Sequence, residues 1–176
     1  VSGLMFELSF DNYTGEISKQ VKDNQNVLIL GGGDGRIVRH LNKKHENLNI
    51  QMIEIDEEVV KISKTHFDFN YDEIKNLTLL YEDATQAIKN VNGKLFDSII
   101  IDCTDPRVDI SNGLYGFEFY ENIMKILSKD GILTQQMDID SEYIEKIQNH
   151  FSDKFDIGFS MVNTPEYGGY TIIMIM

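Results

Sequence analysis

Val27-Leu-Ile-Leu-Gly-Gly-Gly-Asp-Gly-Arg36 is the stretch that decides the fold of this chain. An apolar run ends in three glycines, an aspartate and a fourth glycine, and a pattern typical of a helix follows. Because glycine lacks a Cβ atom, the backbone can turn sharply there and approach a ligand closely. A buried strand that leads through such a turn into a helix N-terminus is typical of α/β proteins that bind nucleotide-like ligands.

The spacing of the glycines distinguishes between classes of ligand. A dinucleotide fingerprint reads G-x-G-x-x-G and would need a glycine at the position of Arg36. Gly31, Gly33 and Gly35 instead form G-x-G-x-G, a pattern associated with nucleosides of the S-adenosylmethionine type. A glycine-rich loop without a ligand is the alternative, but the position between a strand and a helix favours the nucleoside.

Size and charge restrict the class of protein further. The 176 residues are enough for one domain with a sizeable core, and 41% apolar with 26% charged residues is an ordinary globular balance. The net charge of -13 argues against nucleic acid and anionic membrane surfaces as partners. It suits a cationic ligand, although acidity that serves only solubility is the alternative.

Location and metal content are also predicted from composition. No apolar run approaches the roughly 18 residues of a membrane span, and the N-terminus lacks the basic flank of a signal peptide. The single cysteine, Cys103, has no partner for an internal disulfide, so we expect a cytoplasmic protein. The four histidines fall on helix patterns, where we expect them to face solvent. Without a His/Cys cluster we expect no metal.

Strand patterns alternate with helix patterns, which predicts a doubly wound α/β sheet of the Rossmann-like, class I methyltransferase type. We expect this sheet to have seven mostly parallel strands and a C-terminal antiparallel hairpin, within a nucleoside-binding catalytic domain over residues 26–176. Residues 1–25 form a short N-terminal segment. The expected strands are 27–30, 50–55, 77–81, 96–102, 131–135, 155–161 and 170–176, with one more over 4–10. The expected helices are 14–21, 35–44, 57–67, 84–91, 117–127 and 141–151. On helix 57–67 we expect Val59, Val60 and Ile62, together with Ile55, to cover the sheet.

Acidic residues follow the carboxyl ends of the first four core strands, where ligands lie in an open α/β sheet. They are Asp34, Glu54, Asp83, Asp102 and Asp105. Many of the 29 acids of this chain must simply be solvated. Four strand ends in succession form one edge of the sheet, however, so we predict an acidic ligand site there.

Two of these acids have positions typical of nucleoside recognition. Glu54 lies nineteen residues after Gly35, close to the spacing of about 20 residues for an acid that accepts both ribose hydroxyls. A charge at a helix N-terminus is the alternative for Glu54. Asp83 is placed to accept a hydrogen bond from an adenine amine, and capping of the following helix is an equally good interpretation.

Asp34 and Asp102 suggest the chemistry. An aspartate inside the glycine turn opposes the carboxylate of an intact methionine tail and attracts a tail that carries only an ammonium, so Asp34 favours a decarboxylated nucleoside. A primary amine, with a pKa near 10.4, must lose a proton before it attacks carbon. Asp102, with Asp105 three residues later, can take that proton and hold the amine in line. A type I turn led by an aspartate is the plainer interpretation and is compatible with this one.

Taken together, these motifs resemble the spermidine/spermine synthases. The matching segments are Leu28-Ile-Leu-Gly-Gly-Gly-Asp-Gly35, Glu54-Ile-Asp56, Glu82-Asp-Ala84, Asp102-Cys-Thr-Asp-Pro106, Leu114-Tyr-x-x-x-Phe-Tyr120, Asp130-Gly-Ile132 and Thr164-Pro-x-Tyr167. Enzymes of this family are aminopropyltransferases of polyamine biosynthesis. They move an aminopropyl group from decarboxylated S-adenosylmethionine, a co-substrate, onto a diamine or polyamine such as putrescine, giving spermidine and methylthioadenosine. The resemblance implies no prosthetic group.

The resemblance also implies a role for each matching residue. Asp102 would be the general base, Asp34 would bind the aminopropyl ammonium, and Glu54 would bind the ribose. The residues implied to contact the rest of the donor are Gly31, Gly33, Gly35, Asp83 and Ala84. Those implied to bind the acceptor amine are Asp105, Gln135, Tyr167 and Tyr115.

Two departures from the family pattern keep alternatives open. Only about 25 residues precede the glycine motif, where the family has a β-domain that contributes acceptor and dimer contacts; the segment 1–25 could be its remnant, and a homodimer stays open. Arg36 replaces a glycine and puts a cation near the acidic site. A class I methyltransferase using S-adenosylmethionine is one alternative function. A non-catalytic nucleoside- or polyamine-binding domain is another.

Overall fold

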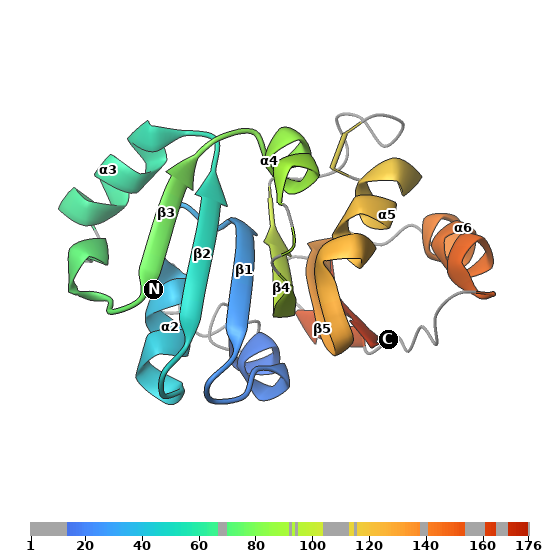
Figure 1. The fold of residues 1–176 in the computed structure, drawn as a ribbon, viewed down its shortest axis with the longest axis horizontal. Coiled ribbons are helices and arrows are strands. Elements are labelled where there is room, and N and C mark those ends of the chain that lie inside the picture. The colour runs from blue at the N-terminus through green and yellow to red at the C-terminus, as the bar shows by residue number, and fades with distance from the viewer. Residues whose placement is uncertain are drawn as a thin grey trace.

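The computed structural model describes residues 14–66, 70–91, 93, 95–103, 113–114, 116–137, 141–153, 161–164 and 169–175. A single sheet with helices on both faces makes up this part of the chain (Figure 1). Its strands are β1 (Asn26–Gly31), β2 (Asn49–Glu54), β3 (Leu77–Tyr81), β4 (Phe96–Asp102), β5 (Leu127–Met137), β6 (Met161–Thr164) and β7 (Gly169–Ile175).

The strand order places β1 at the point where the topology reverses. The order is β3-β2-β1-β4-β5-β7-β6, so the chain first builds outward from β1 to β3 and then returns to the other side of β1 with β4. Strands β1 to β5 are parallel, whereas β7 runs antiparallel to both β5 and β6. In sheets of this kind, ligands bind beyond the carboxyl ends of the strands that flank the reversal, here β1 and β4.

Helices follow most of the parallel strands. They are α2 (Arg36–Lys44), α3 (Glu57–His66), α4 (Ala84–Asn90), α5 (Phe117–Ile126) and α6 (Ser141–Phe151), with a 3₁₀ turn η1 (Tyr71–Glu73) and a helix over 14–20. None of the helices within the described ranges is both long and apolar enough to cross a bilayer.

Alternating side chains of β1 supply both halves of the core, because successive residues of a strand point to opposite faces. Leu28 and Leu30 pack against α4, α5 and α6, whereas Val27 and Ile29 pack against α2, α3 and helix 14–20. All four side chains are completely buried. A strand that is apolar on both faces, as β1 is, is typical of the centre of a parallel sheet.

The predicted parallel α/β architecture is confirmed. Strands β3 and β4 have the bounds predicted from their apolar patterns, while β5 begins four residues earlier than expected. The register of β4 with β5 shifts between the pairs Phe96–Leu127 and Ser98–Ile132, and Asp130 within the shifted stretch has a φ of 65°. The Asp-Gly pattern at 130–131 therefore marks an irregularity inside a strand rather than the start of one. The predicted strand over 4–10 and most of the one over 155–161 lie outside the described residues.

Helix α3 presents a different face to the sheet than its apolar pattern predicted. Val60 and Ser63 are buried, but Val59 and Ile62 are exposed on the flank of the helix, and Ile55 is 71% exposed. The prediction was wrong for these three side chains because α3 lies beside the edge strand β3. There a narrow inward face, defined by positions 60 and 63, is sufficient to cover the sheet.

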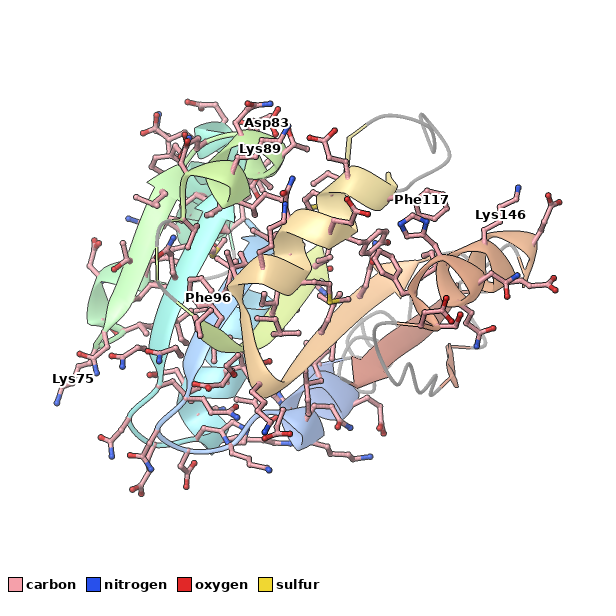
Figure 2. All side chains as sticks on the ribbon, turned by 45° about the vertical axis from the view of Figure 1, so that its right-hand side comes forward. Lys75, Asp83, Lys89, Phe96, Phe117 and Lys146 are labelled. Atoms are coloured by element: carbon pink, nitrogen blue, oxygen red, sulfur yellow. The ribbon has the colours of Figure 1, made fainter. Side chains whose placement is uncertain are left out.

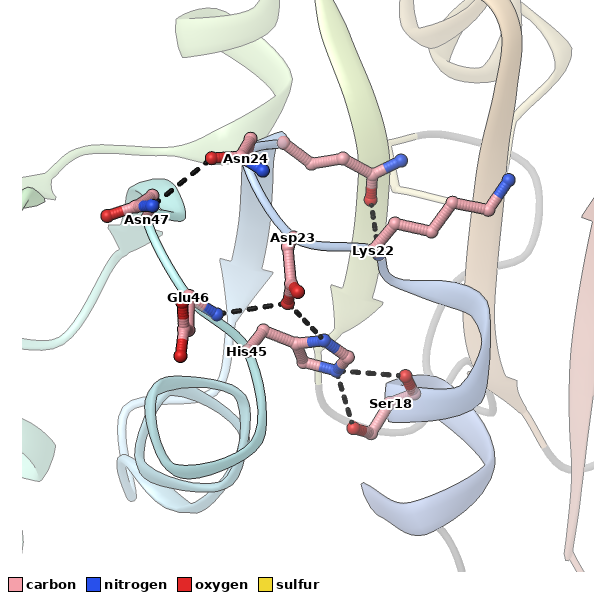
Figure 3. A network of polar contacts seen from close by, with 8 residues as sticks. Ser18, Lys22, Asp23, Asn24, His45, Glu46 and Asn47 are labelled. Atoms are coloured by element: carbon pink, nitrogen blue, oxygen red, sulfur yellow. Dashed lines mark hydrogen bonds and ion pairs between the residues drawn. The ribbon is translucent and has the colours of Figure 1, made fainter.

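Helix 14–20 is anchored to the loop between α2 and β2 by His45 (Figure 3). Its Nε2 lies 2.9 Å from Ser18 Oγ, and its Nδ1 lies 3.5 Å from a carboxylate oxygen of Asp23. The backbone N–H of Glu46 donates to the same Asp23 oxygen at 3.0 Å. The expectation that His45 faces solvent was therefore wrong, since this ring lies between two segments. Ile17 and Val21 are buried alongside, so residues before β1 contribute to the core.

We predict that the centre of β4 dominates stability. Ile100→Ala removes a completely buried side chain and should lower the free energy of unfolding by about 2–5 kcal/mol, because the core cannot fill the resulting cavity. Ile62→Ala, the same change at a half-exposed position of α3, should change it by less than about 0.5 kcal/mol. Urea denaturation of both variants measures the two values, and equal losses would contradict this description of the core.

Candidate functional site

The predicted acids lie at the edge of the sheet where the parallel strands end. Glu54 and Asp102 are the last residues of β2 and β4, and Asp34 and Asp83 lie within three residues of the ends of β1 and β3. Figure 2 shows the polarity of the sheet, with Asp83 after β3 at the upper end and Lys75 before β3 at the lower end. The sheet therefore brings four of the five predicted acids to one edge, and the fifth, Asp105, lies outside the described residues.

The glycine turn is packed directly against the end of β4. Gly31 pairs with Asp102 in the sheet, and the backbone N–H of Gly32 donates to the carbonyl oxygen of Asp102 at 3.1 Å. Gly31 has a φ of 83°, and a Cβ atom there would overlap the Asp102 carbonyl oxygen. Only glycine fits this position, for reasons of both conformation and space. The turn thereby places the Asp102 side chain next to the backbone that would meet a ligand.

Glu54 fixes the next part of the turn. Its Oε2 accepts a hydrogen bond from the backbone N–H of Gly33 at 2.9 Å, and its Oε1 accepts one from the N–H of Asp56 at 3.0 Å. A Cβ at Gly33 would lie 2.6 Å from Glu54 Oε2, so this glycine is needed for the close approach. The carboxylate is almost completely buried. Each of its oxygens can accept a second donor, which leaves capacity for two hydroxyls of a ligand.

Tyr71 binds the carbonyl group of the same glycine, and its role was missed from the sequence. Its hydroxyl donates to the carbonyl oxygen of Gly33 at 2.7 Å, and Ser63 Oγ lies 3.3 Å from that hydroxyl. Burial raises the pKa of the Tyr71 phenol to about 12, so the hydroxyl stays protonated and remains a donor. Asn70, which accepts from the N–H of Asp72, begins the short 3₁₀ turn that carries Tyr71. That Asn-x-Asp cap is the one local signal of this element.

Asp34 is paired with the residue that departs from the expected glycine pattern. Its Oδ2 lies 3.0 Å from Nε of Arg36, and its Oδ1 accepts from the backbone N–H of Arg36 at 2.9 Å. Both side chains are about one-quarter exposed, at 26% for Asp34 and 27% for Arg36. The pair lies where the turn enters α2, and Gly35, in a left-handed conformation, is the N-cap residue of that helix.

Asp83 caps α4, as one of its two interpretations predicted. Its Oδ1 accepts from the backbone N–H of Thr85 at 2.7 Å and from the Thr85 hydroxyl at 2.6 Å. The side chain is exposed, and Ala84 behind it is buried. Both of these hydrogen bonds use Oδ1 of an exposed side chain, so capping does not exclude ligand binding by Asp83.

Cys103 lies directly after Asp102 and points inward. Its Sγ lies 3.3 Å from the carbonyl oxygen of Leu30, to which the thiol donates. Burial, followed by the negative charge of Asp102, raises the pKa of the thiol to about 12. Cys103 is therefore a small buried side chain that packs against β1, and at neutral pH it stays protonated.

The acceptor residues implied by the resemblance are only partly within the described structure. Gln135 lies in β5, where its side chain is completely buried and its Oε1 accepts from the Tyr120 hydroxyl at 2.7 Å. A contact between Gln135 and an acceptor amine stays a prediction. Tyr115 and Tyr167, like Asp105, lie outside the described residues. No group of three or more His, Cys, Asp or Glu side chains in the described ranges is arranged to hold a metal ion.

The chain matches a known protein family over most of its length. The family described as "Spermine/spermidine synthase domain" matches residues 14–176. The chain belongs to this family. The match begins at the helix anchored by His45 and includes every acid of the sheet edge.

Three similar curated proteins are each named polyamine aminopropyltransferase. The Prochlorococcus marinus (strain MIT 9312) protein is 39% identical over 132 residues, covering 73% of this chain and 45% of the relative. The Methanocaldococcus jannaschii protein is 35% identical over 140 residues, covering 78% of this chain and 47% of the relative. The Clostridioides difficile (strain 630) protein is 39% identical over 112 residues, covering 62% of this chain and 39% of the relative. The chain spans less than half the length of these relatives.

Solved structures of the family share the fold. A spermidine synthase in complex with the transition state analogue AdoDATO superimposes with a TM-score of 0.72 at 21% identity, covering 96% of this chain and 61% of that one. The spermidine synthase from Thermotoga maritima gives a TM-score of 0.69 at 21% identity, covering 90% of this chain and 56% of that one. The Rossmann-like arrangement predicted from the strand and helix patterns is thus shared with both structures.

The contact between Gly31 and Asp102 gives a prediction with a matched control. Gly31 and Gly93 both have a positive φ, but no atom of the described residues lies within 4 Å of a Cβ built at Gly93. Alanine at either position should cost about 1–2 kcal/mol through backbone strain. Gly31→Ala should cost about 2 kcal/mol more, because the Asp102 backbone must move. Denaturant unfolding measures the difference, and similar losses in both variants would show that the close approach is unimportant.

Proposed function

We propose that this chain transfers an aminopropyl group from decarboxylated S-adenosylmethionine to a diamine or polyamine such as putrescine, giving spermidine and methylthioadenosine. The observation that carries the proposal is the position of Asp102 against the Gly31-Gly32 turn, with Glu54 and Asp83 on the same edge of the sheet. An adenosine and the amine that attacks its sulfonium side chain would then meet at the point where β1 and β4 end.

The donor side of the site follows from the groups around the glycine turn. Glu54 keeps acceptor capacity for both ribose hydroxyls while it holds the N–H of Gly33. Asp83 offers an oxygen to the adenine amine above Ala84. The exposed side chain of Ile55, which follows Glu54, gives an apolar surface on which a base can pack. Asp34 is the carboxylate assigned to the aminopropyl ammonium.

The proposed reaction is a direct displacement at carbon. The nitrogen of the acceptor amine attacks the methylene group next to the sulfonium, and a new C–N bond forms as the C–S bond breaks. The electron pair of that bond stays on sulfur, which becomes the neutral thioether of methylthioadenosine. Asp102 takes a proton from the acceptor nitrogen, and by accepting a hydrogen bond it holds that nitrogen in line with the carbon.

The acceptor side is assigned to Asp105, Tyr115, Gln135 and Tyr167. A second carboxylate three residues after Asp102 would bind the distal ammonium of a diamine, and aromatic walls would enclose its methylene chain. Charge supports this assignment, since a polyamine is a polycation and the chain has a net charge of -13. We assign the protein to the cytoplasm and expect no prosthetic group. A homodimer stays a prediction.

The alternative functions are less well supported. The three curated relatives reported above are named for aminopropyl transfer rather than methyl transfer. An acid within the glycine turn also disfavours the carboxylate of intact S-adenosylmethionine. A domain that only binds nucleosides would keep its affinity for methylthioadenosine but show no transfer to any diamine.

Asp102→Asn should separate chemistry from binding. Without the carboxylate, turnover with decarboxylated S-adenosylmethionine and putrescine should fall by about 10²–10⁴-fold, because the amine keeps its proton. Affinity for methylthioadenosine should stay nearly unchanged, since that product lacks both the amine and the sulfonium charge. Product formation measured by mass spectrometry, beside calorimetry of the product complex, provides both values.

Asp72→Asn is the matched control for this experiment. It removes the same charge from a side chain that is 82% exposed and lies on η1, outside the acidic edge. Turnover of this variant should equal that of the unmodified chain. Full turnover in Asp102→Asn would refute the role of general base, and absence of transfer by the unmodified chain would favour the binding domain.

A further inference from the structure

We infer that Arg36 lowers the selectivity of the donor site for a decarboxylated nucleoside tail, because it competes with the ligand's ammonium for Asp34. The inference rests on the proposed function, because it concerns the same donor nucleoside. It assigns a role to Arg36, whose presence is explained neither by the resemblance to the family nor by the roles of the acids. On this view Arg36 reduces the preference for a decarboxylated tail over an intact one.

The geometry of the pair supports competition. Arg36 engages both oxygens of one carboxylate, Oδ1 through its backbone N–H at 2.9 Å and Oδ2 through Nε at 3.0 Å. A ligand ammonium that reaches Asp34 thus meets a carboxylate whose charge already has a partner. Each carboxylate oxygen can still accept another hydrogen bond, so the ammonium is weakened as a ligand but not excluded.

The position of Arg36 in its helix argues that the residue is not there to stabilise α2. It is the first residue of that helix, whose first turn contains no acid, and Lys43 and Lys44 lie in the last turn. Cations stabilise the last turn of a helix through the helix dipole and are unfavourable in the first. The carboxylate of Asp34 offsets this unfavourable placement. A helix with better local charges would have a neutral or acidic residue here.

The consequence for the ligand follows from the signs of the charges. The tail of decarboxylated S-adenosylmethionine carries an ammonium alone, which Arg36 repels and Asp34 attracts. The tail of intact S-adenosylmethionine also carries a carboxylate, which Arg36 attracts and Asp34 repels. With both residues present the two effects oppose each other. Because the pair is about one-quarter exposed, solvent screens it only in part.

Arg36→Gln tests the inference by removing the charge while keeping a long side chain of good helix propensity. Calorimetry measures the affinity of the unmodified chain and the variant for decarboxylated S-adenosylmethionine, intact S-adenosylmethionine and methylthioadenosine. The ratio of the two Kd values, intact over decarboxylated, should rise by about fivefold in the variant. Affinity for methylthioadenosine, which has no charged tail, should not change and reports that the site is folded.

Two further variants complete the experiment. Arg39→Gln removes the same charge from an exposed position three residues further along α2 and should leave the ratio unchanged. Asp34→Asn removes the attracting charge, and the ratio should fall below that of the unmodified chain.

The outcomes separate this inference from the proposed function. An unchanged ratio in Arg36→Gln, with all three ligands bound normally by the unmodified chain, overturns the inference and leaves the proposed function intact. Loss of methylthioadenosine affinity in Arg36→Gln also overturns it, because Arg36 would then support the turn itself. Failure of the unmodified chain to bind either the decarboxylated donor or methylthioadenosine overturns the proposed function and the inference with it.

Discussion

The close approach of the Gly31 backbone to the carbonyl oxygen of Asp102 is the constraint on which the rest of the site depends. It joins β1 to β4 at the point where the strand order reverses, so the glycine turn and the Asp102 carboxylate share one location. A side chain at Gly31 would push the ends of β1 and β4 apart. The same contact therefore fixes both the packing of the core between these strands and the position of the acids at their ends. The same residue therefore affects both the stability of the fold and the geometry of the proposed ligand site.

Around that contact, buried side chains fix both backbone polar groups of Gly33 in the turn. Glu54 accepts from the N–H of Gly33, and the Tyr71 hydroxyl donates to its carbonyl. Holding the peptides on both sides of Gly33 orients the turn before any ligand arrives, which lowers the cost of ordering the site on binding. In the proposed function, the acids at the strand ends then act as fixed charges toward a cationic nucleoside instead of reorganising around it.

Local sequence patterns predicted the central strands and the glycine turn. The apolar runs of β1 and β4 and the Gly-x-Gly-x-Gly spacing identified the central strands, the turn and four acids of its edge, because each signal lies within a few residues. Tyr71 was missed because it reaches Gly33 from 38 residues away. His45 was misjudged because its partner Ser18 is 27 residues distant. The exposure of Val59 and Ile62 depends on the position of α3 beside the edge strand β3. The spacing of apolar residues along the helix does not reveal that position.

The central claim is that the carboxyl edge of the parallel strands binds an adenosine. Titration of ¹⁵N-labelled protein with methylthioadenosine, followed by amide NMR shifts, tests it most directly. The largest shifts should fall on residues 31–35, Ile55 and Ala84, while Asn24, Asn47 and Asn76, which precede β1, β2 and β3 at the opposite edge, should stay unchanged. Shifts concentrated at those three asparagines, or none at saturating nucleoside, would contradict the account.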